Sequence, residues 1–370
     1  MNAYYRKEIS RKNMLVIACI LFIMPALIAQ QVVKGRITDA TDGTPIPYAS
    51  ILIGNTTRGT ISDEMGNYAI TFSGSGSFEI VVFHVGFKSN IHKINTPKSD
   101  HQHDVALEIN ELPEVVVTAR SNYKQKDVNL FWSKLLGEKP SKNGMEVLNP
   151  YNVHYHMNSK RVLTAFCNEP IEIINHHMGY RIKFVLNNFQ HNYEINETFI
   201  EGMPYYEELI PQDNRQRIRW EKKRREVYNV SLTHFFRALY SEQIHAEGYY
   251  LTIKDYIENG QAVPLASILQ PNQDMMQVNI SVPLILMCYS IPVTAQIIKG
   301  SYGDLIQNKK YPIAMELLPQ QTIIYPDGTY SGNLRIKELR GYIFGLSSML
   351  PVEYPAYNNV RKSFPELIRK

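Results

Sequence analysis

Three short stretches near the beginning of the chain decide how it starts to fold: VKGRITD at residues 33–39, GTPIPYASI at 43–51 and GTISDEMGNY at 59–68. In the first, apolar and polar residues alternate, which is typical of a half-exposed strand. In the third, Asp63 and Gly66 are expected to form a turn, because aspartate accepts bonds from nearby backbone and glycine adopts positive φ. The apolar run Phe78–Val85 predicts a central buried strand. Closely spaced strands separated by turn residues predict a β-sandwich over residues 31–107.

In order and spacing, these three stretches resemble the carboxypeptidase regulatory-like domain. The resemblance implies a transthyretin-like sandwich of seven strands that acts as an accessory module and carries no catalytic residues. Such domains stand at the head of many outer-membrane nutrient receptors and other exported proteins of Gram-negative bacteria.

The next segment, residues 108–127, is expected to be a linker. Within it, Leu112–Ala119 resembles the segment that leads into the plug of TonB-dependent receptors. The roughly 250 residues that follow are too few for a plug and a 22-stranded barrel. A complete nutrient receptor is therefore not expected.

Residues 1–29 have the pattern of a signal peptide. Basic residues come first (Arg6, Lys7, Arg11 and Lys12), and the apolar run Met14–Ala29 follows, ending in a small residue suited to cleavage. The alternative is an uncleaved anchor helix, since the run is close to the shortest length that spans a bilayer. Export from a Gram-negative cell predicts a location in the periplasm, in the outer membrane or at the cell surface.

Removal of the signal peptide changes the charge and leaves two cysteines. The whole chain has 39 basic and 35 acidic residues, and the chain without residues 1–29 has 35 and 34. Such a near-neutral protein is not expected to bind nucleic acid. Cys167 and Cys288 each lie in an apolar, strand-like run, which favours two buried thiols over a disulfide. No transmembrane helix is expected after the signal, because the best run, Val282–Val293, is short and contains two prolines.

Residues 128–357 are expected to form an α+β domain with one long helix, followed by a C-terminal tail at 358–370. Val128–Leu136 predicts a short amphipathic helix, and successive strands are predicted between Tyr151 and Glu201. The long helix is expected over Arg215–Tyr240, which contains only good or neutral helix formers. The turn sequence Tyr325–Tyr330 predicts a hairpin, since Asp-Gly suits a type I′ turn. The predicted fold class is therefore mainly β.

The first part of the long helix is strongly basic. It offers a candidate surface for phosphate, an acidic glycan, lipopolysaccharide or a protein partner, formed by Arg217, Arg219, Lys222, Lys223, Arg224 and Arg225. The alternative is the solvated face of a helix, which the near-neutral charge of the mature chain favours.

Histidines provide the other candidate sites. His234 and Arg237 are three residues apart and share a helix face, where they would act as an acid/base with an anion clamp. No carboxylate or nucleophile stands at a known spacing from them. His154 and His156 point the same way in a strand, as two metal ligands require, and His176-His177 is a second pair. No motif supplies a third ligand, so neither a metal nor a cofactor is expected.

Parts of the second half (168–175, 177–182 and 220–239) resemble a family of uncharacterised exported proteins that also begin with this domain, from which no activity follows. The sequence thus predicts a non-catalytic binding or assembly factor of the cell envelope. The expected partner is an envelope protein or glycan, through which the protein associates with the membrane. Two alternatives stay open: an envelope hydrolase that uses His234, and a small or truncated outer-membrane barrel.

Overall fold

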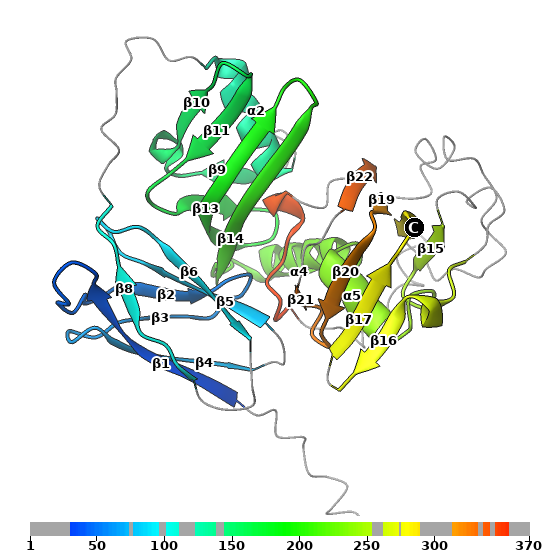
Figure 1. Cartoon of the computed structure of the whole chain (residues 1–370), viewed down its shortest axis with the longest axis horizontal. Helices are drawn as coiled ribbons and strands as arrows, with labels where there is room; N and C mark the ends of the chain where they lie inside the picture. Colours follow the sequence, from blue (N-terminus) through cyan, green and yellow to red (C-terminus); the bar gives the residue numbers. More distant parts are fainter. Residues whose placement is uncertain are drawn as a thin grey trace, which may run out of the picture.

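The computed structural model describes residues 30–73, 77–95, 101–110, 123–137, 144–253, 262–273, 275–288, 313–331, 336–340 and 345–354. The expected signal peptide and C-terminal tail lie outside these residues, as does most of the expected linker. Within them the protein is mainly β, as predicted, and its strands form separate groups (Figure 1). The buried apolar side chains form three main cores.

The first core is a sandwich of two sheets. One sheet contains β1 (Gln30–Asp39), β4 (Asn67–Ser73), β7 (His101–Gln102) and β8 (Val105–Leu107); the other contains β2 (Ser50–Ile53), β3 (Gly59–Ile61), β5 (Ser77–Phe83) and β6 (Asn90–Asn95). Both β7 and β8 run parallel to β1 and pair with successive parts of it, so together they form one interrupted strand. Counted in this way, the sandwich has the seven strands that were predicted. The run from Phe78 is the predicted buried strand, since β5 lies between β2 and β6 and Val82 is fully buried.

The turn before β4 closes the sandwich at one end. The carboxylate of Asp63 accepts bonds from the backbone N–H groups of Met65 and Asn67, at 2.9 and 2.8 Å. These bonds, chiefly the one from Asn67, lower the pKa of Asp63. Gly66 has φ 77°, and a Cβ added there would overlap the carbonyl oxygen of Ile37. The turn therefore requires glycine for two separate reasons, its backbone conformation and the close approach of β1.

We expect Gly66→Val to lower the free energy of unfolding by at least about 1–3 kcal/mol, the usual cost of a strained backbone conformation. Gly43→Val is the matched control, because Gly43 has a similar φ of 75° but nothing within 4 Å of an added Cβ. Urea denaturation of both variants measures the difference, which reports the overlap with Ile37 and the tighter contacts with Pro45 and Ile46. Equal losses in the two variants would contradict the close approach of β1.

The second core lies between a six-stranded sheet and a helix. The sheet contains β9 (Met145–Val147), β10 (His154–Met157), β11 (Val162–Phe166), β12 (Ile171–Asn175), β13 (Tyr180–Asn192) and β14 (Glu197–Glu208), with a 3-10 turn, η1 (Pro150–Asn152), before β10. Helix α2 (Gln125–Leu136) packs Phe131 against Phe189 of β13, with ring centroids 4.8 Å apart. This helix begins three residues before the predicted start because the Asp127 side chain accepts a bond from the N–H of Lys124.

The third core contains two four-stranded sheets and a helix. One sheet is formed by β15 (Tyr249–Ile253), β18 (Leu284–Cys288), β19 (Ile313–Leu317) and β22 (Ile336–Arg340), and the other by β16 (Leu269–Asn272), β17 (Met275–Ile280), β20 (Gln320–Ile324) and β21 (Tyr330–Ser331). A 3-10 turn, η3 (Leu265–Ser267), precedes β16. Helix α5 (Leu232–Tyr240) buries Phe235, Phe236 and Leu239 in this core, as predicted for that face.

The predicted single helix over Arg215–Tyr240 is wrong. The chain instead forms α4 (Asn214–Tyr228) and α5, separated by a short break. The break occurs because the Ser231 side chain accepts a bond from the N–H of His234 and so caps a new helix. The two helices consequently contribute to different cores, with Val227 of α4 in the second and Phe235 of α5 in the third.

The predicted hairpin at Tyr325–Tyr330 is confirmed, but its turn is not type I′. That type requires positive φ at both central residues. Gly328 has φ 81°, whereas Asp327 is not among the residues with positive φ. The N–H of Tyr325 donates to the carbonyl of Thr329, and the N–H of Gly328 donates to the carbonyl of Tyr325. These two bonds enclose a three-residue loop, in which Pro326 sets the first turn conformation. Proline explains the difference, because its ring fixes a negative φ.

The sandwich packs directly against the second core. Leu52 and Val81 of the sandwich bury their side chains against Val185 of β13. The loop after β2 also pairs with β14: Asn55 donates to the carbonyl of Pro204, and Tyr206 donates to that of Thr56. The module is therefore fixed to the rest of the chain by apolar contact and by backbone hydrogen bonds.

Residues 345–354, here called the strap, contact all three cores and include a 3-10 turn, η4 (Leu346–Ser348). Leu346 lies in the second core. In the sandwich, the N–H of Val352 donates to the carbonyl of Asn55, and the carboxylate of Glu353 accepts from the N–H of Thr57 at 2.8 Å. In Figure 1 the strap is the orange-red segment near the centre of the molecule, where the three parts meet.

Arg237 of α5 joins the strap to the third core. Its guanidinium donates to the carbonyls of Val352 (2.7 Å), Tyr354 (3.2 Å) and Asp327 (2.8 Å), and to the hydroxyl of Tyr228 (3.0 Å). Because lysine has no planar fork of donors, it cannot replace these four bonds together.

We expect Arg237→Lys to destabilise the protein by at least about 1.5–3 kcal/mol, the value for one hydrogen bond to a charged group. Arg215→Lys is the control, since Arg215 is an exposed arginine on α4. Thermal unfolding followed by circular dichroism measures both. An Arg237→Lys protein as stable as the control would contradict the joining role of the guanidinium.

Candidate functional site

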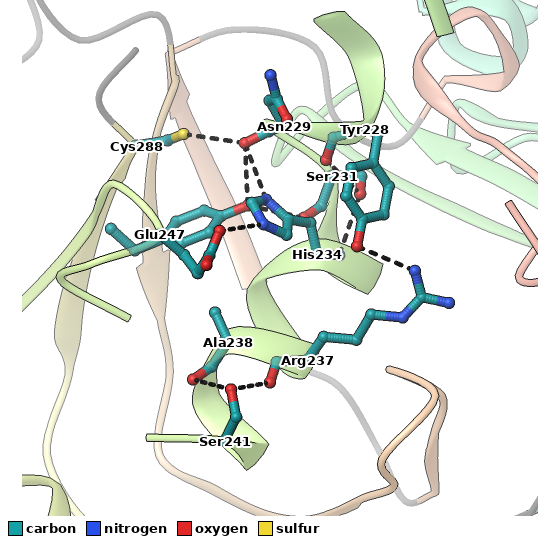
Figure 2. Close-up of polar contacts among 10 residues, drawn as sticks. Tyr228, Asn229, Ser231, His234, Arg237, Ala238, Ser241, Glu247 and Cys288 are labelled. Atoms are coloured by element: carbon teal, nitrogen blue, oxygen red, sulfur yellow. Dashed lines mark hydrogen bonds and ion pairs between the residues drawn. The ribbon is translucent and has the colours of Figure 1, made fainter. Parts of the chain in front are cut away.

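The polar cluster around His234 was the first candidate site, and the structure does place a carboxylate in it. The Nε2 atom of His234 is 3.0 Å from a carboxylate oxygen of Glu247, and Nδ1 is 2.9 Å from the hydroxyl of Tyr249 (Figure 2). Nδ1 is also 3.3 Å from the carbonyl of Asn229. Glu247 was missed in the sequence because it lies beyond α5, in the turn before β15, where no helical spacing relates it to His234.

Arg237 does not join His234 in this cluster, although both lie on α5. Figure 2 shows its side chain extending away from the imidazole toward Tyr228. Since the guanidinium is occupied by backbone carbonyls and the Tyr228 hydroxyl, Arg237 is not available as an anion clamp. The expected acid/base and clamp pair is therefore not formed.

Two side chains near the cluster have the chemistry of a nucleophile. The Ser231 hydroxyl donates to the carbonyl of Tyr228 at 2.9 Å, and Cys288 Sγ is 3.6 Å from the carbonyl of Asn229. Burial raises the pKa of Cys288 to about 12, so its thiol stays protonated at neutral pH. Burial also raises the pKa of Tyr249 well above its ordinary value. The cluster thus contains a histidine and a carboxylate, while its thiol and its phenol keep their protons. Its contacts with the carbonyls of Asn229 and Ser231 stabilise the break between α4 and α5.

The two cysteines lie in different cores and form no disulfide with each other. Burial raises the pKa of Cys167 as well, to about 11. Thiol alkylation requires the thiolate, which a raised pKa makes rarer at a given pH.

In a chain that begins at Gln30, we expect neither cysteine to be alkylated by iodoacetamide at pH 7.5 within an hour, and both to react after denaturation. Intact-protein mass spectrometry counts the added groups. Because the raised pKa values keep both thiols protonated near neutral pH, labelling should increase as the pH rises toward 11. Rapid modification of Cys288 at pH 7.5 would indicate an activated thiol and contradict a structural role for the cluster.

A surface pocket of about 510 Å³ lies elsewhere, between α4 and the turn that joins β12 to β13. It is lined by His176, His177, Gln216, Arg219, Trp220, Lys222, Lys223 and Glu226. One wall depends on Trp220, whose indole N–H donates to the carbonyl of His176 at 2.8 Å. The ring lies against Gly179, where any Cβ would overlap it. The pocket therefore brings together two sequence features that looked unrelated, the basic helix and the His176-His177 pair.

The charges of the pocket are only partly neutralised. Lys223 forms an ion pair with Glu226 at 3.6 Å, and His176 contacts Glu146 at 2.7 Å. Arg219 and Lys222 are exposed and have no acidic partner in the described part of the chain. These two side chains are thus the cations that remain available to a ligand.

The other predicted basic residues have different surroundings. Arg217 is paired with Glu221 at 2.6 Å, and neither Arg217 nor Arg225 lines the pocket. Arg224 is buried and donates to the carbonyls of Met178 (2.7 Å) and Gly179 (3.2 Å). The expectation that Arg224 is a surface contact is wrong, because its guanidinium is bound to the backbone of the turn that joins β12 to β13.

His154 and His156, the candidate metal ligands, are not joined by a third ligand among the described residues. His154 and His156 lie on β10 and are both exposed on one side of it, as the strand period predicts. Across the residues that the structure describes, no group of three His, Cys, Asp or Glu side chains is placed to hold a metal ion. The two histidines alone therefore do not define a metal site.

The facing sheets of the first core, together with the Asp63–Asn67 turn, define a small β-sandwich module of transthyretin-like type. Residues 33–117 match the family model of the CarboxypepD_reg-like domain, which confirms the predicted module. The match ends before α2, so it describes the first module and not the rest of the chain. No curated protein matches the chain.

Solved structures similar to this chain share only small parts of it. Catechol 1,2-dioxygenase from Acinetobacter sp. ADP1 is 14% identical over 24% of this chain and 55% of its own, with a TM-score of 0.20. 3-Chlorocatechol 1,2-dioxygenase from Rhodococcus opacus 1CP is 8% identical over 22% of this chain and 60% of its own, with a TM-score of 0.19. A cohesin–X-dockerin complex from Acetivibrio cellulolyticus is 16% identical over 20% of this chain and 51% of its own, with a TM-score of 0.18. The chain spans little more than half the length of these proteins, and nothing about function follows from them.

Proposed function

We propose that the protein is exported to the Gram-negative cell envelope and acts there as a non-catalytic binding or assembly factor. The observation that carries the proposal is the pocket beside α4, where Arg219 and Lys222 have no acidic partner. The pocket takes an anionic group of an envelope glycan or of a protein partner. The regulatory-like module supports this view, since domains of this type are typical of envelope proteins and serve as accessory units.

The proposed location is supported by the sequence pattern of residues 1–29 and by the type of the first module. No helix among the described residues has the length and apolar character needed to cross a bilayer. We propose that the protein associates with the membrane through its partner, as expected from the sequence.

Non-catalytic binding accounts for the pocket better than catalysis does. The lining contains no Ser, Thr or Cys, so it offers no hydroxyl or thiol nucleophile beside the His176–Glu146 contact. The His234–Glu247 contact lies in a different part of the molecule, on the far side of the α4–α5 break. A ligand in the pocket is therefore held by charge and hydrogen bonds.

We expect the double variant Arg219→Glu/Lys222→Glu to lose retention on a heparin column, which carries a sulfated polyanion. Its free energy of unfolding, measured by thermal denaturation, should stay within about 0.5 kcal/mol of the parent value. Arg215→Glu is the matched control, because Arg215 is an exposed basic residue of the same helix that does not line the pocket. The parent protein should elute earlier with added salt, since screening shortens to about 8 Å at physiological ionic strength. Equal losses in the variant and the control would show a diffuse basic surface without a defined site.

The hydrolase alternative keeps one specific observation in its favour, the carboxylate of Glu247 beside His234. If the protein hydrolyses an ester or peptide substrate, and His234→Ala and Glu247→Gln each remove that turnover with folding intact, the alternative replaces our proposal. Loss of folding in both variants, with no turnover in the parent, would agree with the structural role of the cluster.

A further inference from the structure

From the donors and charges that line the pocket, we infer that its ligand is a phosphate monoester and not a carboxylate. The inference rests on the proposed function and specifies the chemical group that the site binds.

Several side chains of the pocket have hydrogen-bond donors that remain free for a ligand. The side-chain oxygen of Gln216 already accepts a bond from the N–H of Gln212 at 2.6 Å, which leaves its NH₂ group to face a ligand. The indole N–H of Trp220 is occupied by His176. The one carboxylate of the lining, Glu226, is held by Lys223. The free polar groups of Arg219, Lys222 and Gln216 are therefore donors, and they match a group that accepts hydrogen bonds.

Arg219 and Lys222 stand three residues apart on α4, on the same face, and carry two positive charges that no described carboxylate neutralises. A phosphate monoester carries about −1.5 to −2 charges at pH 7 and has three acceptor oxygens. A carboxylate carries one charge and two oxygens, so it would leave one of the two cations without a counter-charge.

The guanidinium of Arg219 has a planar fork of donors that pairs two of its N–H groups with two phosphate oxygens, whereas Lys222 acts as a point charge. His177 lines the pocket from a different element, the turn after β12, and carries a ring N–H in either neutral tautomer. Donors thus approach from two walls, as a tetrahedral group requires and a planar carboxylate does not.

Isothermal titration calorimetry of the full chain lacking residues 1–29 tests the inference. The probes are glucose 1-phosphate, glucuronate and glucose at equal ionic strength. We expect glucose 1-phosphate to bind at least tenfold more tightly than glucuronate, and glucose not to bind. Arg219→Gln should lose most of this preference because it removes one of the two positive charges that favour the more highly charged phosphate, and Arg215→Gln should keep it. Equal affinity for the phosphate and the carboxylate would overturn the inference, as would an unchanged preference in Arg219→Gln.

A phosphate monoester occurs both on soluble or glycan-linked sugars and in lipid headgroups. Co-sedimentation with phosphatidylcholine vesicles that contain 20% phosphatidic acid separates these sources. Binding to such vesicles, lost in Arg219→Glu/Lys222→Glu, identifies a lipid phosphate, and binding to glucose 1-phosphate alone identifies a sugar phosphate; both outcomes support the inference.

Failure of the inference is distinguishable from failure of the proposed function. If retention on heparin depends on Arg219 and Lys222 but glucose 1-phosphate shows no preference over glucuronate, only the choice of phosphate is wrong. If neither heparin nor any phosphate probe binds, the pocket is not an anion site and the proposed function falls with it.

Discussion

The guanidinium of Arg237 is the point at which separate parts of the chain depend on one another. A single side chain on α5 supplies donors to the strap, to the hairpin after β20 and to the last residue of α4. Each of these segments presents backbone carbonyls or a hydroxyl with no regular ladder to pair with, and buried groups of this kind are costly when left unpaired. Arg237 binds several of these carbonyls and the hydroxyl at once. It thereby fixes the position of α5 relative to the strap, the hairpin and the end of α4.

The pocket inherits its shape from this arrangement. Helix α4 is held at its end by Tyr228, which contacts Arg237, and in its middle by Arg224, whose guanidinium lies 4.0 Å from the ring of Tyr180. Arg237 and Arg224 thus position the helix that carries the exposed residues Arg219 and Lys222. A helix anchored in this way presents Arg219 and Lys222 at fixed places, and preorganised donors lose less entropy when a ligand binds.

Much of the local structure could be predicted from the sequence, because the apolar pattern of a strand or helix repeats over a few consecutive residues. The sandwich turn at Asp63, the strands between β10 and β14 and the helix α2 all follow from short-range patterns. The helix break at Ser231 was missed because every residue from Arg215 to Tyr240 is compatible with a helix, and only the serine's capping bond interrupts it. The burial of Arg224 was missed for another reason: its partners, Met178 and Gly179, are more than 40 residues away in the chain. The pocket has the same long-range origin in the contact between Trp220 and His176, although a glycine after two histidines and a lone tryptophan in a basic run were signals of close packing.

The strap also has a consequence for the order in which the protein is assembled. Thr57 and Glu353 are 296 positions apart, yet they share a hydrogen bond. In a chain that emerges from its amino end, the sandwich is complete and buried long before the strap exists, since domains generally fold as units as they appear. The surface that the strap later covers, around Asn55 and Thr57, is therefore open during this interval. The carbonyl of Asn55 and the N–H of Thr57 then face water, and their hydrogen bonds with Val352 and Glu353 are among the last to form.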